Sequence, residues 1–291
     1  MTAPWRDRHG RLIPIKAAVL PALFLPAIVL ALWWPTGQLG GRPVTEAIHI
    51  TGLWTIRLMM ISLVMTPART LLGWPKLLLV RRMVGVAAMT YGIAHLSLYV
   101  IDQNFRLGTV ASEIVLRFYL TIGFIALSGL SVLGATSTDA AMRRLGRGWK
   151  WLHRTLYGIA VLALLHYFIQ SKAMVSEAVV FAGLYVWLMA WRVAPEGWAR
   201  RVSTLLALAV LAAVATAGIE CAWYGLTTGI DPWRVLSANE TLRYGLRPAH
   251  WVALVGLGVT LLALLERLRR RPVIGAVTGR GQPVRPRAQA W

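Results

Sequence analysis

The sequence predicts an all-α integral membrane protein, a helical bundle with about eight transmembrane helices. Of its 291 residues 57% are hydrophobic and only 14% are charged, and the mean hydropathy is +0.59. A soluble domain typically carries about 25% charged residues. The chain also holds 14 tryptophans, which favour the two membrane–water interfaces. Together these observations place most of the chain inside a lipid bilayer.

Eight apolar stretches each approach the ~20 residues that a membrane-crossing helix needs. They are residues 17–34, 48–66, 83–101, 114–135, 151–169, 175–193, 203–226 and 249–266. The first stretch is long and lacks a small-residue cleavage site, so we expect a retained helix rather than a signal peptide. Pro21 and Pro26 are expected to kink it.

Basic residues gather in every second connection. The clusters are Arg6, Arg8, Arg11 and Lys16; Arg69, Lys76, Arg81 and Arg82; Arg143, Arg144, Arg147 and Lys150; Arg192, Arg200 and Arg201; and Arg267, Arg269, Arg270 and Arg271. The connections between these clusters are balanced in charge. The positive-inside rule therefore predicts that both termini lie in the cytoplasm. Because the net charge of +20 is divided among short loops, it indicates membrane orientation and not a nucleic-acid partner.

Histidines inside two of the apolar stretches are the main functional signal. His95 and His166 lie in the third and fifth stretches, each ~20 Å from the cytoplasmic end at 1.5 Å per residue. Ionisable residues within membrane helices usually mark a pathway or a cofactor, and histidine is a common axial ligand of haem iron. We therefore expect one haem between the two imidazoles. The alternative is a packed polar pair without a cofactor.

His153 and Arg57 leave more than one interpretation open. His153 lies one turn inside the cytoplasmic end of the fifth stretch, where it could ligate a second haem, touch a quinone or flavin headgroup, or simply hydrogen-bond at the interface. Arg57, in the middle of the second stretch, needs an anion. A haem propionate, a cofactor phosphate or a structural carboxylate would serve, and Glu113 is disfavoured by its depth.

Small and aromatic residues surround the two midspan histidines. Ala88, Tyr91, Gly92 and Tyr99 fall at helical spacings on the side of His95, where they are expected to leave room for a flat macrocycle. Gly123 and Gly129 lack the spacing of a helix-dimer motif, and we see no internal repeat. Cys221 is the single cysteine, which excludes an internal disulfide, a cysteine-ligated iron–sulfur cluster and a cysteine-based zinc site.

Three segments resemble the MsrQ family. They are GLWTIRLMMISLVMTPAR (52–69), RRMVGVAAMTYGIAHLSLYVID (81–102) and TSTDAAMRRLGRGWKWLHRTLYGIAVLALLHYFIQSK (136–172). MsrQ proteins are the haem-binding membrane subunits of the bacterial protein-methionine-sulfoxide reductase system and are similar to ferric-reductase-like transmembrane proteins. The resemblance covers about residues 10–195. It divides the chain into a haem-binding core of six helices (1–195), two additional helices (196–271) and a basic tail (272–291) that is expected to be disordered.

The resemblance implies both cofactors and partners. It implies a b-type haem, with His95, His153 and His166 matching the family's three functional histidines, and an associated FMN. It further implies that electrons come from the quinone pool of the bacterial inner membrane and pass to MsrP, a periplasmic molybdenum-containing reductase that repairs oxidised methionines. The chain would then act as an electron-transfer subunit and would not transform a substrate itself.

The sequence is compatible with two other functions. A ferric-chelate or cytochrome b-type reductase of the same fold would use another acceptor. Such enzymes usually carry a cytosolic domain that binds a flavin and a nicotinamide cofactor. The chain has no GxGxxG motif followed by an acidic residue, which is the signature of dinucleotide binding. A transporter or structural subunit without a cofactor would usually show broken helices or repeats, which are not evident here.

Overall fold

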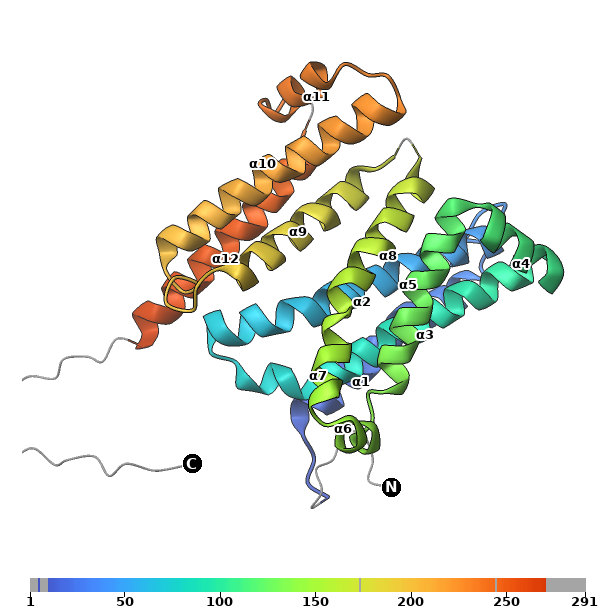
Figure 1. Cartoon of the computed structure of the whole chain (residues 1–291), viewed down its shortest axis with the longest axis horizontal. Helices are drawn as coiled ribbons and strands as arrows, with labels where there is room; N and C mark the ends of the chain where they lie inside the picture. The colour runs from blue at the N-terminus through green and yellow to red at the C-terminus, as the bar shows by residue number, and fades with distance from the viewer. Residues whose placement is uncertain (1–4, 6–9, 173, 244, 271–291) are drawn as a thin grey trace, which may run out of the picture.

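The structure, a computed structural model, describes residues 5, 10–172, 174–243 and 245–270. Within these residues it contains twelve α-helices and one short 3₁₀ helix (Figure 1). The helices are α1 (Pro14–Trp33), α2 (Pro43–Leu72), α3 (Leu78–Asp102), α4 (Leu107–Leu116), α5 (Phe118–Ala135), α6 (Asp139–Leu145), α7 (Arg147–Arg154), α8 (Leu156–Ser171), α9 (Ser176–Val193), α10 (Val202–Thr227), α11 (Pro232–Asn239) and α12 (Pro248–Arg270), with η1 at Pro75–Leu77. The expected disorder of the tail 272–291 falls outside the described residues.

The prediction of eight membrane-crossing helices is confirmed. Eight helical segments of the described chain are long and apolar enough to cross a bilayer, so the protein is a multi-pass membrane protein. Two of the predicted stretches contain a break in the helix. The stretch 114–135 begins at Phe118, because Arg117 adopts an extended backbone that separates α4 from α5. The stretch 151–169 belongs to a longer segment that breaks at Thr155 into α7 and α8.

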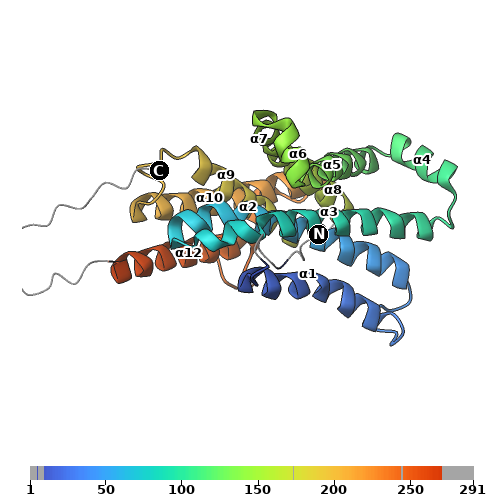
Figure 2. The same cartoon turned by 90° about the horizontal axis from the view of Figure 1, so that it is seen from below.

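The bundle has two distinct ends. Successive membrane-crossing helices alternate in direction, which brings α4 and α11 to one end and α6 and α7 to the other, near the start of α1 (Figure 1). We call these the α4 end and the α6 end. Figure 2 shows α1 at the periphery of the bundle, next to α3. Only 6% of the apolar window of α1 is buried, against 44% for α2, which is therefore the most enclosed of these helices.

Side chains from neighbouring helices repair the hydrogen bonding of two proline-containing helices. A proline inside a helix lacks an N–H and leaves a carbonyl four residues earlier without its partner. Pro67 has this effect on the Leu63 carbonyl of α2, and Arg192 of α9 donates a hydrogen bond to that carbonyl. Irregular backbone in a membrane requires such replacement partners, so Arg192 stabilises the packing of α9 on α2.

Tyr91 acts in a similar way on α1. Its hydroxyl donates to the Leu23 carbonyl at 2.9 Å and accepts from the Ala27 amide at 3.1 Å, so it is inserted into the helical ladder beside Pro26. The kink expected near Pro26 is thus accompanied by a side-chain insertion, a known cause of helix bending. Tyr91 consequently points toward α1 instead of lining a haem cavity.

The last helices form a layer against α9. Helices α10 and α12 pack on each other and on α9, and α11 packs on α10. Glu220 of α10 is 1% exposed and accepts hydrogen bonds from Arg247 at 2.7 Å and Asn239 at 2.8 Å. Because a buried charge requires a partner, this network joins α10 to α11 and to the start of α12.

Candidate functional site

His95 of α3 and His166 of α8 lie next to each other inside the bundle. Their ring centroids are 6.3 Å apart and the ring planes meet at 84°. Both residues are half-buried. The two midspan histidines that the sequence singled out, 71 positions apart (166 − 95), are therefore brought together by the packing of their helices.

Each histidine is held by the same kind of bracket on a neighbouring helix. We define a bracket as one backbone carbonyl, one glycine four residues later and the histidine that contacts both. His95 Nδ1 lies 2.8 Å from the Ile48 carbonyl oxygen of α2, and His166 Nδ1 lies 2.8 Å from the Tyr119 carbonyl oxygen of α5. The glycines are Gly52 and Gly123, where an added Cβ would come within 2.9 Å and 2.7 Å of the respective Nδ1 atoms. Only glycine permits this approach.

The brackets fix the chemistry of both rings. A carbonyl oxygen can only accept a hydrogen bond, so each Nδ1 must carry the proton and each Nε2 keeps its lone pair. A histidine that donates one ring N–H to a backbone carbonyl is the usual arrangement of a metal-ligating imidazole, because this hydrogen bond sets the tautomer and the orientation of the ring. The pair therefore presents two oriented nitrogen ligands.

The spacing of the rings fits one metal ion between them. A metal–imidazole bond is about 2 Å long, so rings on opposite sides of one metal have centroids roughly 6 Å apart. The observed 6.3 Å agrees. The described residues contain no group of three or more His, Cys, Asp or Glu side chains that could hold a metal ion. Two histidines suit haem iron, whose four remaining ligands come from the porphyrin.

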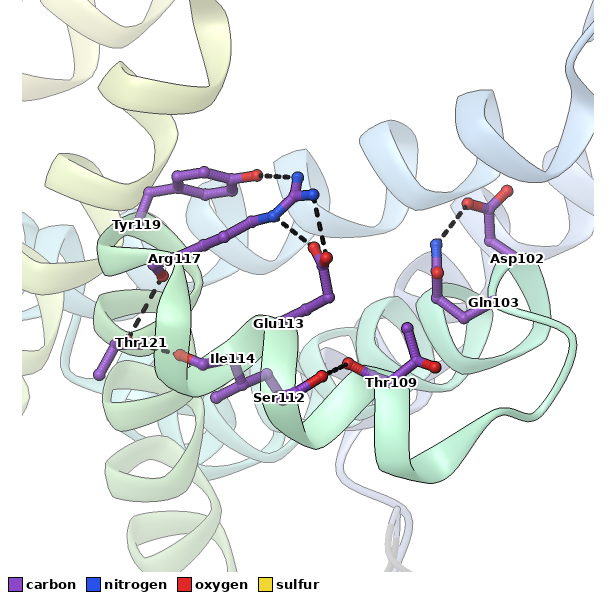
Figure 3. Close-up of polar contacts among 9 residues, drawn as sticks. All are labelled: Asp102, Gln103, Thr109, Ser112, Glu113, Ile114, Arg117, Tyr119 and Thr121. Carbon is purple, nitrogen blue, oxygen red and sulfur yellow. Dashed lines mark hydrogen bonds and ion pairs between the residues drawn. The ribbon is translucent and has the colours of Figure 1, made fainter.

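Residues at the α4 end hold the second bracket in place. Figure 3 shows Arg117, which forms an ion pair with Glu113 of α4 and donates to the Tyr119 hydroxyl at 3.1 Å. Thr121 of α5 also donates to the Ile114 carbonyl. These contacts fix the backbone at Tyr119, whose carbonyl accepts from His166. The hydrogen bond to Tyr119 and the nearby Glu113 carboxylate raise the pKa of the Arg117 guanidinium above its usual value, so Arg117 is a permanent cation.

His153 does not join the other two histidines. It lies on α7 near the α6 end, where its ring stacks on Trp149 with centroids 3.9 Å apart. Its Nε2 is 3.3 Å from the Thr136 hydroxyl, and Arg81 lies within electrostatic range. Arg192, which contacts the Tyr157 ring, is also within range of Arg81. Arg81 thus interacts electrostatically with both His153 and Arg192, and we call these three residues the basic cluster.

Arg57 meets a carboxylate of the protein itself. Its Nη2 lies 2.8 Å from Glu177 Oε1 of α9, and Tyr167 of α8 donates to Glu177 Oε2 at 3.0 Å. The guanidinium also lies 5.2 Å from the centre of the Trp54 ring. Of the anions considered from the sequence, the structure supplies the structural carboxylate. An arginine at the centre of a membrane helix costs about 2.5–3.5 kcal/mol on insertion scales, and this pairing offsets part of that cost.

The two bracket glycines were not anticipated from the sequence. Gly92, which was expected to leave room near His95, instead packs against Leu127 and Thr55. The usable signal was a spacing: both hydrogen bonds join residues 47 positions apart, and a glycine follows each carbonyl residue by four. Without knowledge of which helices pair, this match cannot be told from coincidence.

Comparison with known proteins identifies the family of the chain. Residues 51–164 match the family described as ferric reductase like transmembrane component. A protein of Rhodospirillum rubrum is 41% identical over 198 residues, covering 67% of this chain and 93% of the relative. Its name is protein-methionine-sulfoxide reductase heme-binding subunit MsrQ. The chain belongs to the MsrQ family. Relatives with the same name include those of Xanthomonas campestris pv. campestris (40%, covering 66% of this chain and 91% of the relative) and Brucella ovis (37%, covering 59% and 78%).

This MsrQ chain is longer than the part it shares with these relatives. About two thirds of it align with the R. rubrum protein, which is itself almost fully covered. No solved structure matches the chain.

Proposed function

We propose that this MsrQ protein is a b-type cytochrome that passes electrons from the quinone pool of the bacterial inner membrane to a periplasmic, molybdenum-containing methionine sulfoxide reductase of the MsrP type. Haem supplies the redox chemistry, and the protein supplies ligation, position and polarity. His95 and His166 would hold the iron through their Nε2 atoms. The observation that carries the proposal is the pair of histidine brackets, which hold two imidazoles with ring centroids 6.3 Å apart and leave both Nε2 atoms without the proton.

The position of the brackets favours delivery of electrons at the α4 end. Both partner carbonyls lie near helix starts at that end, since α2 begins at Pro43 and α5 at Phe118. The distribution of basic loops supports a periplasmic α4 end and cytoplasmic termini. An acceptor in the periplasm would therefore approach the side on which the iron is nearest to the surface.

The basic cluster at the α6 end suits the phosphate of the FMN that the family resemblance implies. Phosphate groups in proteins are bound mainly by arginine guanidinium groups and backbone amides. Arg81 and Arg192 are two guanidinium groups of this kind. Flat surfaces are offered by the Tyr157 ring beside Arg192 and by the Trp149 ring, which stacks on His153. We propose the basic cluster as the FMN-binding region, with His153 in contact with the flavin.

An absorption spectrum together with quinol reduction tests the proposed function. Protein purified in detergent from cells supplied with a porphyrin precursor is expected to show the Soret and α bands of a b-type haem, which sharpen on reduction with dithionite. Ubiquinol or menaquinol analogues should reduce the same haem, and an MsrP-type reductase with methionine sulfoxide should reoxidise it. A folded protein without visible absorbance would refute the proposal.

We expect truncation after Arg201 to leave haem bound. The brackets lie on α2, α3, α5 and α8, whereas α10 and α12 pack mainly on α9 and on each other. Ending the chain at Arg201 retains Ala199, whose carbonyl accepts from the Trp191 indole of α9. The measurement is the haem-to-protein ratio of the purified truncated protein. A ratio far below that of the full chain would mean that the last helices belong to the haem-binding core.

A further inference from the structure

A partly exposed polar cluster lies between α2, α8 and α9. Arg57, Glu177 and Tyr167 form this cluster, which we call the α2–α9 cluster. The Arg57 and Glu177 side chains are 37% and 44% exposed. Ile61 and Val64, one and two turns further along the same side of α2, are each 44% exposed. Because residues at i, i+4 and i+7 share one helix face, Arg57 belongs to an exposed and otherwise apolar stripe of α2.

This exposure is unusual for a charged pair in a membrane helix. Ionisable side chains there normally face the bundle interior and often mark a substrate or proton pathway. Glu220 follows the first part of this rule, being 1% exposed and held by Arg247 and Asn239. Glu177 differs, because 44% of its side chain is exposed.

The α2–α9 cluster also lies close to the histidine brackets. Tyr167 follows His166 directly in α8, and its hydroxyl donates to Glu177 at 3.0 Å. On α2, Trp54 lies two residues after the bracket glycine Gly52, and its ring lies under the Arg57 guanidinium. A flat ligand next to Trp54 and Glu177 would therefore border α2 and α8, two of the four helices that carry the brackets.

We propose that the α2–α9 cluster binds the membrane quinol and that Glu177 accepts a proton from it. This inference rests on the proposed function, because it assumes that a quinol is the electron donor. The ligand must be soluble in the bilayer, carry hydroxyl groups that donate to a carboxylate, and present a flat ring to Trp54. A quinol meets all three requirements.

The reaction at this site balances with ferric haem as the oxidant. A quinol loses two electrons and two hydroxyl protons and becomes a quinone. Ferric haem held by His95 and His166 would accept these electrons one at a time, and the sulfoxide reductase would take each electron from it in turn. One hydroxyl proton passes to a Glu177 carboxylate oxygen and from there to water at the α4 end, since Glu177 is in the first turn of α9. The second proton follows by the same route after Glu177 has been deprotonated.

Replacing Glu177 with glutamine tests the proposal. Glutamine retains a hydrogen-bonding side chain of the same length but cannot take up a proton. In the haem-loaded full-length protein, the rate of haem reduction by a short-chain ubiquinol or menaquinol is expected to fall about 100-fold, the lower range for loss of a general base. Haem content, the oxidised spectrum and reduction by dithionite should not change. Glu240→Gln, at an exposed glutamate of the α4 end, is the matched control and should reduce at the wild-type rate.

Equilibrium binding gives a second readout that does not depend on turnover. Tyr167→Phe removes a hydroxyl without changing the ring. Tyr167→Phe and Arg57→Gln, made as two separate variants, should each weaken binding of a radiolabelled short-chain quinone, measured with the haem kept oxidised. Suppose that quinol reduces the wild-type haem, that Glu177→Gln is reduced at the same rate, and that the other two variants bind the quinone with unchanged affinity. The proposed site is then wrong, and the proposed function stands. If neither quinol reduces wild-type protein whose haem accepts electrons from dithionite, the quinol donor itself is refuted, and this site with it.

Discussion

Replacing either His95 or His166 with alanine is expected to remove most of the haem. Each substitution deletes one of the two nitrogen ligands that the brackets orient. Loss of a mere outer partner of a metal ligand already costs about 10- to 100-fold in metal affinity, so loss of the ligand itself should cost more. The measurement is the haem-to-protein ratio of protein purified in detergent, from a pyridine haemochrome assay and total protein.

His49→Ala is the matched control for this experiment. His49 lies in the first turns of α2 with an exposed side chain beside Glu46, and its loss should leave the haem content unchanged. A stronger test replaces His95 with glycine and adds imidazole to the growth and purification media. Free imidazole can bind in the vacated space and supply the missing nitrogen, so the haem content should recover in part. Normal haem occupancy in His95→Ala or His166→Ala would show that the ligand assignment is wrong.

The sequence was sufficient for the eight membrane-crossing helices and for the pairing of His95 with His166. Hydropathy reports directly on the length of chain that lipid can surround, and an ionisable residue in the middle of such a stretch is rare enough to mark a site. Helix breaks were harder to place. Arg117 and Thr155 interrupt helices within apolar surroundings, and their positions depend on tertiary contacts such as the Arg117 ion pair with Glu113.

Partners across helices were beyond the reach of the sequence. Arg57 was expected to need an anion, yet Glu177 lies 120 positions away, and nothing local identifies it. Tyr91 was placed correctly near His95 along the chain, but it points to α1, where Pro26 disturbs the helix. In each case the sequence predicts that a polar group needs a partner, and only the packing of helices decides which one.

The bracket glycines offer a test that leaves both ligands in place. Gly123→Ala would put a Cβ 2.7 Å from His166 Nδ1 and 2.8 Å from Cε1, and the neighbouring Tyr119 carbonyl accepts from that same Nδ1. The imidazole must therefore rotate or shift, which weakens its hydrogen bond and turns Nε2 away from the metal position. Because this hydrogen bond is an outer contact of the ligand, we expect haem affinity to fall about 10- to 100-fold. The measurement is a haem titration of the apoprotein followed by its Soret absorbance.

Gly158→Ala separates this effect from a general effect on folding. Gly158 lies in α8, the helix that carries His166, and an added Cβ there would meet no atom within 4 Å. Alanine is the better helix former of the two residues, so both variants favour the helical state of the chain locally. If haem affinity falls in Gly123→Ala while Gly158→Ala retains the wild-type value, the loss comes from the displaced imidazole. Equal affinities in the two variants would mean that the close contact of glycine and histidine does not position the ligand.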